Sequence, residues 1–146
     1  MSDLLTSGLG AAKRPMPQPT DLSAPYWEGC RSGELRYLEC RTCGTVFFPP
    51  EVVCINCLSE DTVWQRSEGR GSVYTFSVIR QQVAPGFPVP SVFAIVELDE
   101  GYPMFSNIIG CRPEDVRIGM PVEVVFESWS PEISLPFFAP VTVPEP

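Results

Sequence analysis

Four cysteines form two Cys-x-x-Cys pairs, Cys40 with Cys43 and Cys54 with Cys57, and ten residues separate the pairs. Each Cys-x-x-Cys turn directs two thiolates to the same side of a tight backbone turn. Two such turns together supply four soft donors around one point, which is the ligand set of a tetrahedral metal site. We therefore expect these four cysteines to bind a zinc ion.

The residue after each pair differs between the two turns. Gly44 follows the first pair and supplies the permissive backbone that such turns commonly use, whereas Leu58 follows the second pair. We expect the second turn to differ from the first in its backbone. Because four thiolates fill a tetrahedral shell and leave no position for water, the zinc is expected to be structural.

Two other uses of the four thiols are disulfide bonds and an iron site. Disulfides require an oxidising compartment, and residues 1–20 contain no apolar core of the length that a signal peptide needs. Iron accepts four thiolates, but the short separation of the pairs suits a zinc ribbon, and no partner redox motif is visible.

Composition narrows the function classes. The 146 residues carry a net charge of −8 and include 44% hydrophobic residues, with no run near the length of a membrane span. We expect a cytoplasmic protein that binds neither nucleic acid nor membrane. The chain has no histidine, which removes the commonest general base and the usual partner of a nucleophile, so we expect it not to be catalytic alone.

The first part of the chain divides into an arm and a metal module. Residues 1–20 are rich in Pro and Gly and predict a flexible arm. Cap residues before position 24 and Gly33 after it predict a helix over residues 23–32, in which Cys30 is buried. Trp27 on this helix either packs against the ribbon or belongs to a partner surface. Strands at 34–38, 46–48 and 63–64 complete a module that spans residues 21–66.

The second part, residues 67–146, predicts strand after strand. Five strands are expected at 72–82, 91–99, 102–110, 121–127 and 137–143, with one helical turn within 112–119 and a hairpin turn at 99–101. This pattern matches a small closed barrel of the OB type. The expected fold is therefore mainly β, with an N-terminal helix and zinc ribbon followed by a five-stranded OB-fold barrel.

The predicted barrel strands carry apolar residues on both faces, so part of the outside must be covered. One candidate cover is the ribbon and helix of the same chain. The other is a partner protein, whose interface would include Phe87 in a stiff proline-rich loop and Phe137 and Phe138 in the last strand.

Several motifs together resemble an acyl-CoA-associated family built from a rubredoxin-like zinc ribbon and an OB-fold. The likeness covers about residues 22–140. It is carried by the four cysteines and by the runs at 26–29 (YWEG), 33–35 (GEL), 47–50 (FFPP), 69–74 (GRGSVY), 96–101 (VELDEG) and 118–122 (IGMPV).

The resemblance implies an accessory subunit of a thiolase-superfamily enzyme. Members are similar to partners of thiolases, hydroxymethylglutaryl-CoA synthases and thiolase-like steroid side-chain aldolases, in which the OB-fold helps form the acyl-CoA channel and the larger subunit holds the catalytic residues. For this chain we favour an aldolase complex with two of each subunit, which cleaves a steroid or bile-acid side-chain CoA thioester.

If CoA contacts this chain, arginine side chains would meet its phosphates by charge-assisted hydrogen bonds. Arg66, Arg70 and Arg80 flank the start of the barrel, near Tyr74 and Phe76. The alternative for each arginine is solvation or pairing with one of the many carboxylates.

Two other function classes stay open at this point. OB barrels and zinc ribbons also bind nucleic acid, although this chain has aromatic residues without a basic groove. A small acyl-CoA enzyme is the other class, and Cys111 would be its nucleophile, but no neighbour in sequence would lower the pKa of that thiol.

Overall fold

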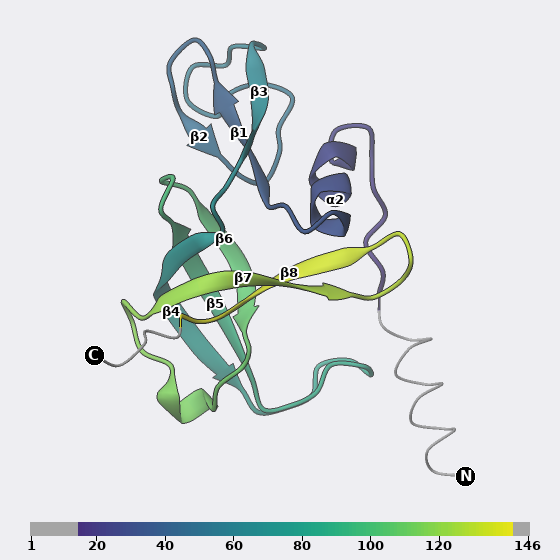
Figure 1. The fold of residues 1–146 in the computed structure, drawn as a ribbon, viewed down its shortest axis with the longest axis vertical. Helices are drawn as coiled ribbons and strands as arrows, with labels where there is room; N and C mark the ends of the chain where they lie inside the picture. Colours follow the sequence, from purple (N-terminus) through teal and green to yellow (C-terminus); the bar gives the residue numbers. More distant parts are fainter. Residues whose placement is uncertain (1–14, 142–146) are drawn as a thin grey trace.

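The computed structural model describes residues 15–141. A short helix and a three-stranded sheet lie at one end of a closed five-stranded barrel (Figure 1). The fold is mainly β, as the sequence predicts. Most of the arm expected at residues 1–20 lies outside the described residues.

The helix α2 (Ala24–Arg31) confirms the helix predicted over residues 23–32. Pro25 lies in its first turn, where a missing N–H leaves no helical hydrogen bond unmade. Gly33 follows with φ of +79°, the left-handed conformation that ends many helices. Tyr26 and Cys30 are buried on the inner face of the helix, which confirms the prediction for Cys30.

The ribbon is an antiparallel sheet with the strand order β2-β1-β3. Its strands are β1 (Arg36–Cys40), β2 (Val46–Phe47) and β3 (Thr62–Arg66). The first strand was expected at residues 34–38 and extends instead to the first metal-binding turn. A small core of its own holds the far end of the ribbon together, formed by Leu38, Cys40, Phe47 and Cys54 with Trp64 packed against it.

The barrel closes in the order β4-β5-β6-β8-β7, which confirms the five predicted strands. The elements are β4 (Arg70–Ile79), β5 (Ser91–Leu98), β6 (Pro103–Ile108), the 3-10 turn η1 (Pro113–Asp115), β7 (Pro121–Ser128) and β8 (Ser134–Pro140). Valine, leucine and aromatic side chains from all five strands fill the interior.

The last strand differs from its predicted position of 137–143, because β8 begins at Ser134. The predicted start is too late because of Pro136, since proline is rare within a strand that is paired on both sides. The Pro136 carbonyl accepts a hydrogen bond from Ser106 Oγ at 2.9 Å, so the backbone of Pro136 faces β6. The two strands pair there through one register position, Ile108 with Phe138, and a proline without an N–H loses no ladder hydrogen bond. We call this junction of β6 and β8 the seam.

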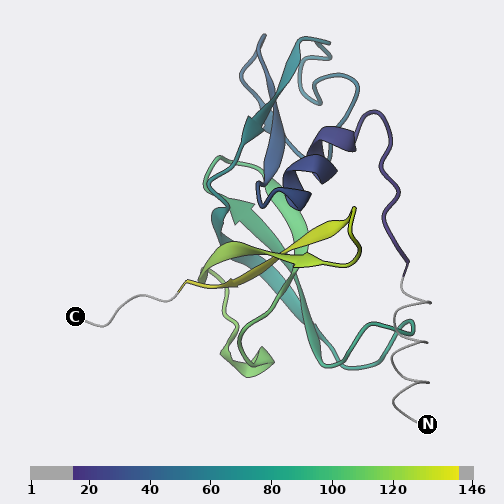
Figure 2. The same cartoon turned by 45° about the vertical axis from the view of Figure 1, so that its right-hand side comes forward.

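The helix, the ribbon and the barrel share one core. Tyr37 of β1 stacks on Tyr102 of the barrel with ring centroids 4.8 Å apart, and Tyr26 packs into the same cluster. The helix also contacts the β7–β8 hairpin, the yellow hairpin beneath it in Figure 2. Part of the barrel is therefore covered by the chain itself.

The link between ribbon and barrel is held by one carboxylate. Glu100, in the β5–β6 turn, accepts hydrogen bonds from Ser67 Oγ at 2.6 Å and from the Glu68 amide at 2.9 Å. Gly69 in turn donates its amide to Ser67 Oγ at 2.9 Å. These bonds attach the chain between the two modules to the barrel. Within residues 15–141 no helix is long and apolar enough to cross a membrane.

Candidate functional site

The four predicted cysteines converge at the end of the ribbon that lies away from the barrel. All four Sγ atoms are within 4.8 Å of one another. Two of the pairs, Cys40 with Cys57 and Cys43 with Cys54, are each 3.6 Å apart between sulfurs. Tetrahedral zinc with Zn–S bonds of about 2.3 Å needs sulfurs about 3.8 Å apart. The cluster therefore fits a zinc ion without rearrangement.

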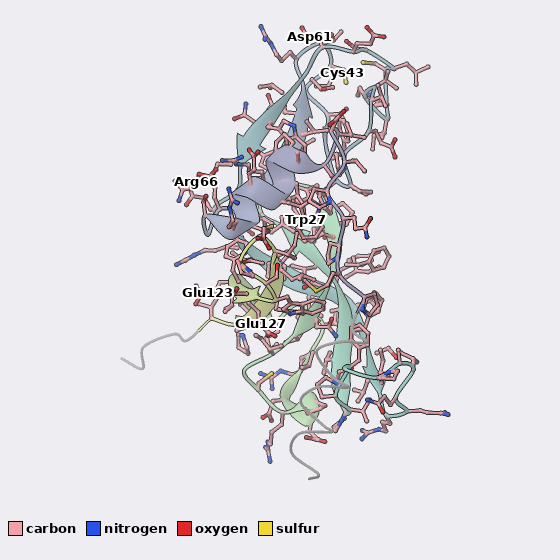
Figure 3. The ribbon with its side chains drawn as sticks, turned by 90° about the vertical axis from the view of Figure 1, so that its right-hand side faces the viewer. Trp27, Cys43, Asp61, Arg66, Glu123 and Glu127 are labelled. Carbon is pink, nitrogen blue, oxygen red and sulfur yellow. The ribbon has the colours of Figure 1, made fainter. Side chains whose placement is uncertain are left out.

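Figure 3 shows Cys43 at the far end of the ribbon, near Asp61, while Glu123 and Glu127 mark the barrel strand β7 well below it. The metal cluster thus lies at a distance from the barrel surface. Chemistry at a barrel surface would have to use other residues.

The two metal-binding turns have the same backbone. The amide of Gly44 donates to the Cys40 carbonyl at 2.8 Å, and the amide of Leu58 donates to the Cys54 carbonyl at 3.0 Å. Gly44 has φ of +79° and Leu58 has φ of +65°. The expectation that the second turn would differ is wrong, because Leu58 adopts the left-handed conformation that glycine adopts in the first turn.

Hydrogen bonds around the cluster act differently on its four thiols. Contacts from Thr45, first through its hydroxyl and then through its backbone, and next from the Asn56 side chain, lower the pKa of the Cys43 thiol to about 6. The Asn56 backbone amide also donates to Cys54 Sγ at 3.3 Å. At Cys57 a Ser59 backbone contact lowers the pKa, but burial and hydrogen bonds with the three other thiols outweigh it and raise the pKa to about 12. The surroundings therefore favour the metal-binding thiolate form at Cys43 and the thiol form at Cys57.

The two remaining cysteines lie apart from the cluster. Burial raises the pKa of Cys30 to about 11. Burial, and then the Asp115 carboxylate, raises the pKa of Cys111. Both thiols stay protonated near neutral pH, so neither has the thiolate character of a nucleophile.

The three predicted CoA-binding arginines do not come together. Arg66 is mostly exposed and lies 3.5 Å from a carboxylate oxygen of Glu34. Arg70 begins β4, and Arg80 follows its last residue, so the two are separated by about 30 Å of extended strand.

The two predicted aromatic companions on β4 also diverge. Tyr74 is 62% exposed, at the position where the register with β5 shifts between Val73 and Thr75. Phe76 points inward and packs against the barrel core. Only Tyr74 of this pair lies on the surface.

The four aromatic residues predicted at a partner interface also lie in different surroundings. Phe138 is fully buried in the barrel core, so its side chain belongs to the interior. Trp27 is half-buried on α2, with its ring 5.0 Å from that of Tyr26. Phe87 and Phe137 come together at the outside of the seam, one on each side of Trp129.

Sequence reasoning missed the most exposed aromatic pair of the barrel. Phe93 of β5 and Phe105 of β6 stack outside the barrel with ring centroids 5.5 Å apart and an interplanar angle of 5°. They are 41% and 65% exposed. Each stands between two buried residues of its strand, so the alternation of side chains along the strand directs it outward. This alternation could have identified both residues once the register of the strands was known.

Family models match both modules of this chain. The model described as "ChsH2, rubredoxin-like zinc ribbon domain" matches residues 27–63, and the model described as "ChsH2, C-terminal OB-fold domain" matches residues 64–127. The two matched segments meet within β3, the last strand of the ribbon.

Individual relatives extend this likeness. A probable enoyl-CoA hydratase alpha subunit of Thermomonospora curvata is 34% identical over 92% of this chain and 42% of its own length. A DUF35 domain-containing scaffold protein of Methanocaldococcus jannaschii is 43% identical over 61% of this chain and 64% of its own length. The chain therefore spans less than two thirds of either relative.

A solved structure titled "Ltp2-ChsH2(DUF35) aldolase" has a chain that matches with a TM-score of 0.78 and 34% identity, over 86% of this chain and 98% of that chain. Ribbon, barrel and family models thus agree on one architecture. The chain belongs to the ChsH2/DUF35 family of zinc-ribbon and OB-fold proteins.

Proposed function

We propose that this chain is a non-catalytic accessory subunit that docks on a thiolase-like partner and helps form its acyl-CoA site. The favoured reaction is retro-aldol cleavage of a steroid or bile-acid side-chain CoA thioester, with the catalytic residues on the partner. Support comes from the solved relative, whose title names two components, Ltp2 and ChsH2(DUF35), in one aldolase.

The observation that carries the proposal is an apolar face on the outside of the barrel. The register aligns Thr75, Ile95 and Phe105 in one outward row across β4, β5 and β6. The stacked Phe93 and Phe105 rings stand in the middle of this face. Interface cores are rich in aromatic residues and poor in charge, which is the composition of these positions. We call this surface the docking face.

A hollow extends the docking face toward the ribbon. It has a volume of about 320 Å³ and lies between the Phe48–Pro49 segment and the outer side of β5 and β6. The described residues that line it are all apolar: Phe48, Pro49, Ile95, Pro103, Met104 and Phe105. A hollow of this kind suits an apolar side chain of a partner protein better than a phosphate or a sugar.

The zinc supports the same function through its coordination. Four thiolate ligands leave no open position, so the ion, when bound, would stabilise the ribbon and supply no Lewis-acid chemistry to a substrate. The role that we propose for the ribbon is to hold α2 and the Phe48–Pro49 segment against the barrel. In this way the metal would shape the docking face from a distance.

The CoA part of the proposal rests on surface residues. Among the predicted set, Arg66, Arg70, Arg80 and Tyr74 are exposed, although Arg66 would have to leave its ion pair with Glu34 to meet a ligand. Arg80 directly precedes the loop that carries Phe87, whereas Arg66 and Arg70 lie at the ribbon end of the barrel. We propose that one of these two groups, and not all three arginines, meets the phosphates.

The test is co-purification. The tagged chain is co-expressed with thiolase-like proteins of its own genome, as the native sequence and as Phe105→Asp. A charge at the centre of the docking face should cost at least tenfold in affinity, because the carboxylate would be desolvated without a partner.

The matched control is Ile118→Asp, which places the same charge at another exposed apolar residue, 71% exposed, in the loop before β7. Retention of the partner by Ile118→Asp and its loss by Phe105→Asp is the expected result. Equal behaviour of the two variants, or no thiolase-like protein retained by the native chain, would count against the proposal.

A second candidate is the accessory part of an acyl-CoA hydratase. It is favoured by the match of 92% of this chain to 42% of a probable enoyl-CoA hydratase alpha subunit. Parallel co-expression with hydratase-like and with thiolase-like proteins decides between the two candidate functions, according to which protein the chain retains.

We propose a complex with two of each subunit, and the mass of the purified complex tests this stoichiometry. We also propose that the protein is located in the cytoplasm, which fractionation of cells tests.

A further inference from the structure

A second hollow lies on the outside of the barrel, across the seam between β6 and β8. We call it the seam groove. It has a volume of about 420 Å³, and its walls come from the loop at residues 86–91, the end of β6 and the β7–β8 hairpin. The strands beneath it pair through one register position, Ile108 with Phe138. The groove is a separate feature from the docking face and from the metal cluster, because its lining includes no residue of either.

Three aromatic rings from different segments line the seam groove in a row. Phe87 of the loop lies 6.4 Å from Trp129, and Trp129 lies 6.4 Å from Phe137 of β8, between ring centroids. Within the loop, the Gln82 side-chain amide donates to the Phe87 carbonyl at 3.1 Å, so this hydrogen bond braces the segment that carries the Phe87 ring. Rings held at such spacing present broad apolar surfaces to a ligand.

The charge of the lining defines what the groove accepts. Among residues 15–141 no lysine or arginine lines it. The single charged residue of that lining is Glu127, whose carboxylate accepts the Trp129 indole N–H at 3.2 Å. A phosphate or a carboxylate would lie beside an anion without a cation to pair with. An uncharged apolar group meets no such cost and buries aromatic surface.

The groove opens beside the docking face. A smaller hollow shares Phe87 and Asn107 with the seam groove, and the same hollow is lined by Phe93 of the docking face. A partner protein on the docking face would therefore come up to the mouth of the seam groove. A ligand in the groove would lie at the edge of the interface, where both subunits reach it.

We propose that the seam groove binds the uncharged, apolar acyl portion of a CoA thioester, a fused-ring or branched hydrocarbon group, while the CoA phosphates lie outside it. The identity of the ligand as part of a thioester rests on the proposed function. The preference for an uncharged apolar ligand rests on the groove alone and is measured without any partner.

The experiment uses the zinc-loaded full chain, labelled with 15N. It is titrated with progesterone, an uncharged fused-ring ketone, and separately with free CoA, while the indole N–H signal of Trp129, assigned with Trp129→Phe, is followed. We expect progesterone to shift this signal in a saturable way and CoA to leave it in place. Phe137→Ala should weaken progesterone binding at least tenfold, because the middle ring loses one of its neighbours.

The matched control is Ile118→Ala, which removes an apolar side chain, 71% exposed, from the loop before β7 and should leave progesterone binding unchanged. Phe87→Ser, from the opposite wall, repeats the test if Phe137→Ala does not fold, as judged by zinc content and the amide spectrum. Absence of a saturable shift, equal binding by the groove variants and the control, or a shift of the Trp129 signal by CoA would overturn the proposal. The titration contains no partner protein, so its result does not depend on whether the chain retains a thiolase-like protein. Likewise, retention of a thiolase-like protein does not depend on progesterone binding, so the two proposals can fail separately.

Discussion

Leu58 holds a left-handed backbone conformation that side chains other than glycine rarely adopt. Its side chain is 71% exposed, so burial does not compensate for that conformation. The reason for the conformation lies in the turn itself, since the Leu58 amide must reach the Cys54 carbonyl for both cysteines to face the metal.

Replacement of Leu58 by Gly is therefore expected to stabilise the ribbon by up to about 1 kcal/mol, the cost of a left-handed non-glycine residue less the extra entropy of an unfolded glycine. Zinc retention against a competing chelator measures this.

The opposite substitution in the first turn is Gly44→Ala, which adds a side chain at φ of +79° and should weaken zinc retention by about 1 kcal/mol. Weaker retention by Leu58→Gly than by the native chain would contradict this reading of the turn.

Among single residues, the sequence predicts the metal ligands better than it predicts which side chains lie on the surface. The four cysteines could be found because ligand spacing is a local property of the chain. Phe138 was misplaced because only the direction of a side chain decides between interior and exterior, and that direction follows from register. Phe105 was missed for the same reason, and its neighbour Phe93 comes from another strand.

Among the elements, the β5–β6 turn does more than reverse the chain. Its Glu100 accepts hydrogen bonds from two consecutive residues of the linker between ribbon and barrel. Such bonds to a carboxylate link two modules whose sheets are otherwise separate.

Replacement of Glu100 by Ala should lower the free energy of unfolding by about 1–2 kcal/mol, because hydrogen bonds to a charged group are lost from a partly exposed site. It should also speed amide hydrogen exchange at Ser67 and Glu68. Chemical denaturation and exchange of the purified chain measure the two effects. Asp99→Ala, at an exposed neighbour in the same turn, is the control and should change neither.

The ribbon end should depend on its metal, because its own core is small. Chelation of zinc, or Cys43→Ser, is expected to release the cluster of Leu38, Phe47 and Trp64 while the barrel keeps its fold. The core that the barrel shares with the helix and the near end of the ribbon is larger, and Leu38 and Phe47 are not part of it. Trp64 fluorescence and the methyl signal of Ile108 report the two parts. Loss of both signals together, or of neither, would show that the modules are not divided in this way.

Element positions were predictable where strands are bounded by turn residues and rich in branched or aromatic side chains, as in β4 to β7. The start of β8 was not, because Pro136 is unfavourable in a fully paired strand and acceptable only beside the open seam. Whether a strand edge is paired depends on residues distant in sequence, which no local pattern contains.

For the whole molecule, the arrangement of sites argues for a subunit that supports the chemistry of another protein. The cysteine cluster fits a closed metal site, the docking face is apolar and exposed, and the seam groove opens beside that face. Separation of metal, interface and groove is what an accessory subunit requires.

The most direct measurement is reconstitution of activity. The purified chain, the retained thiolase-like partner and their mixture are each given a β-hydroxyacyl-CoA with a fused-ring side chain, and carbon–carbon bond cleavage is followed by product analysis. The account predicts cleavage by the mixture at least a hundredfold faster than by either protein alone, with Phe105→Asp reducing the mixture to the rate of the partner. Cleavage by the chain alone, or a partner equally active without it, would contradict the account.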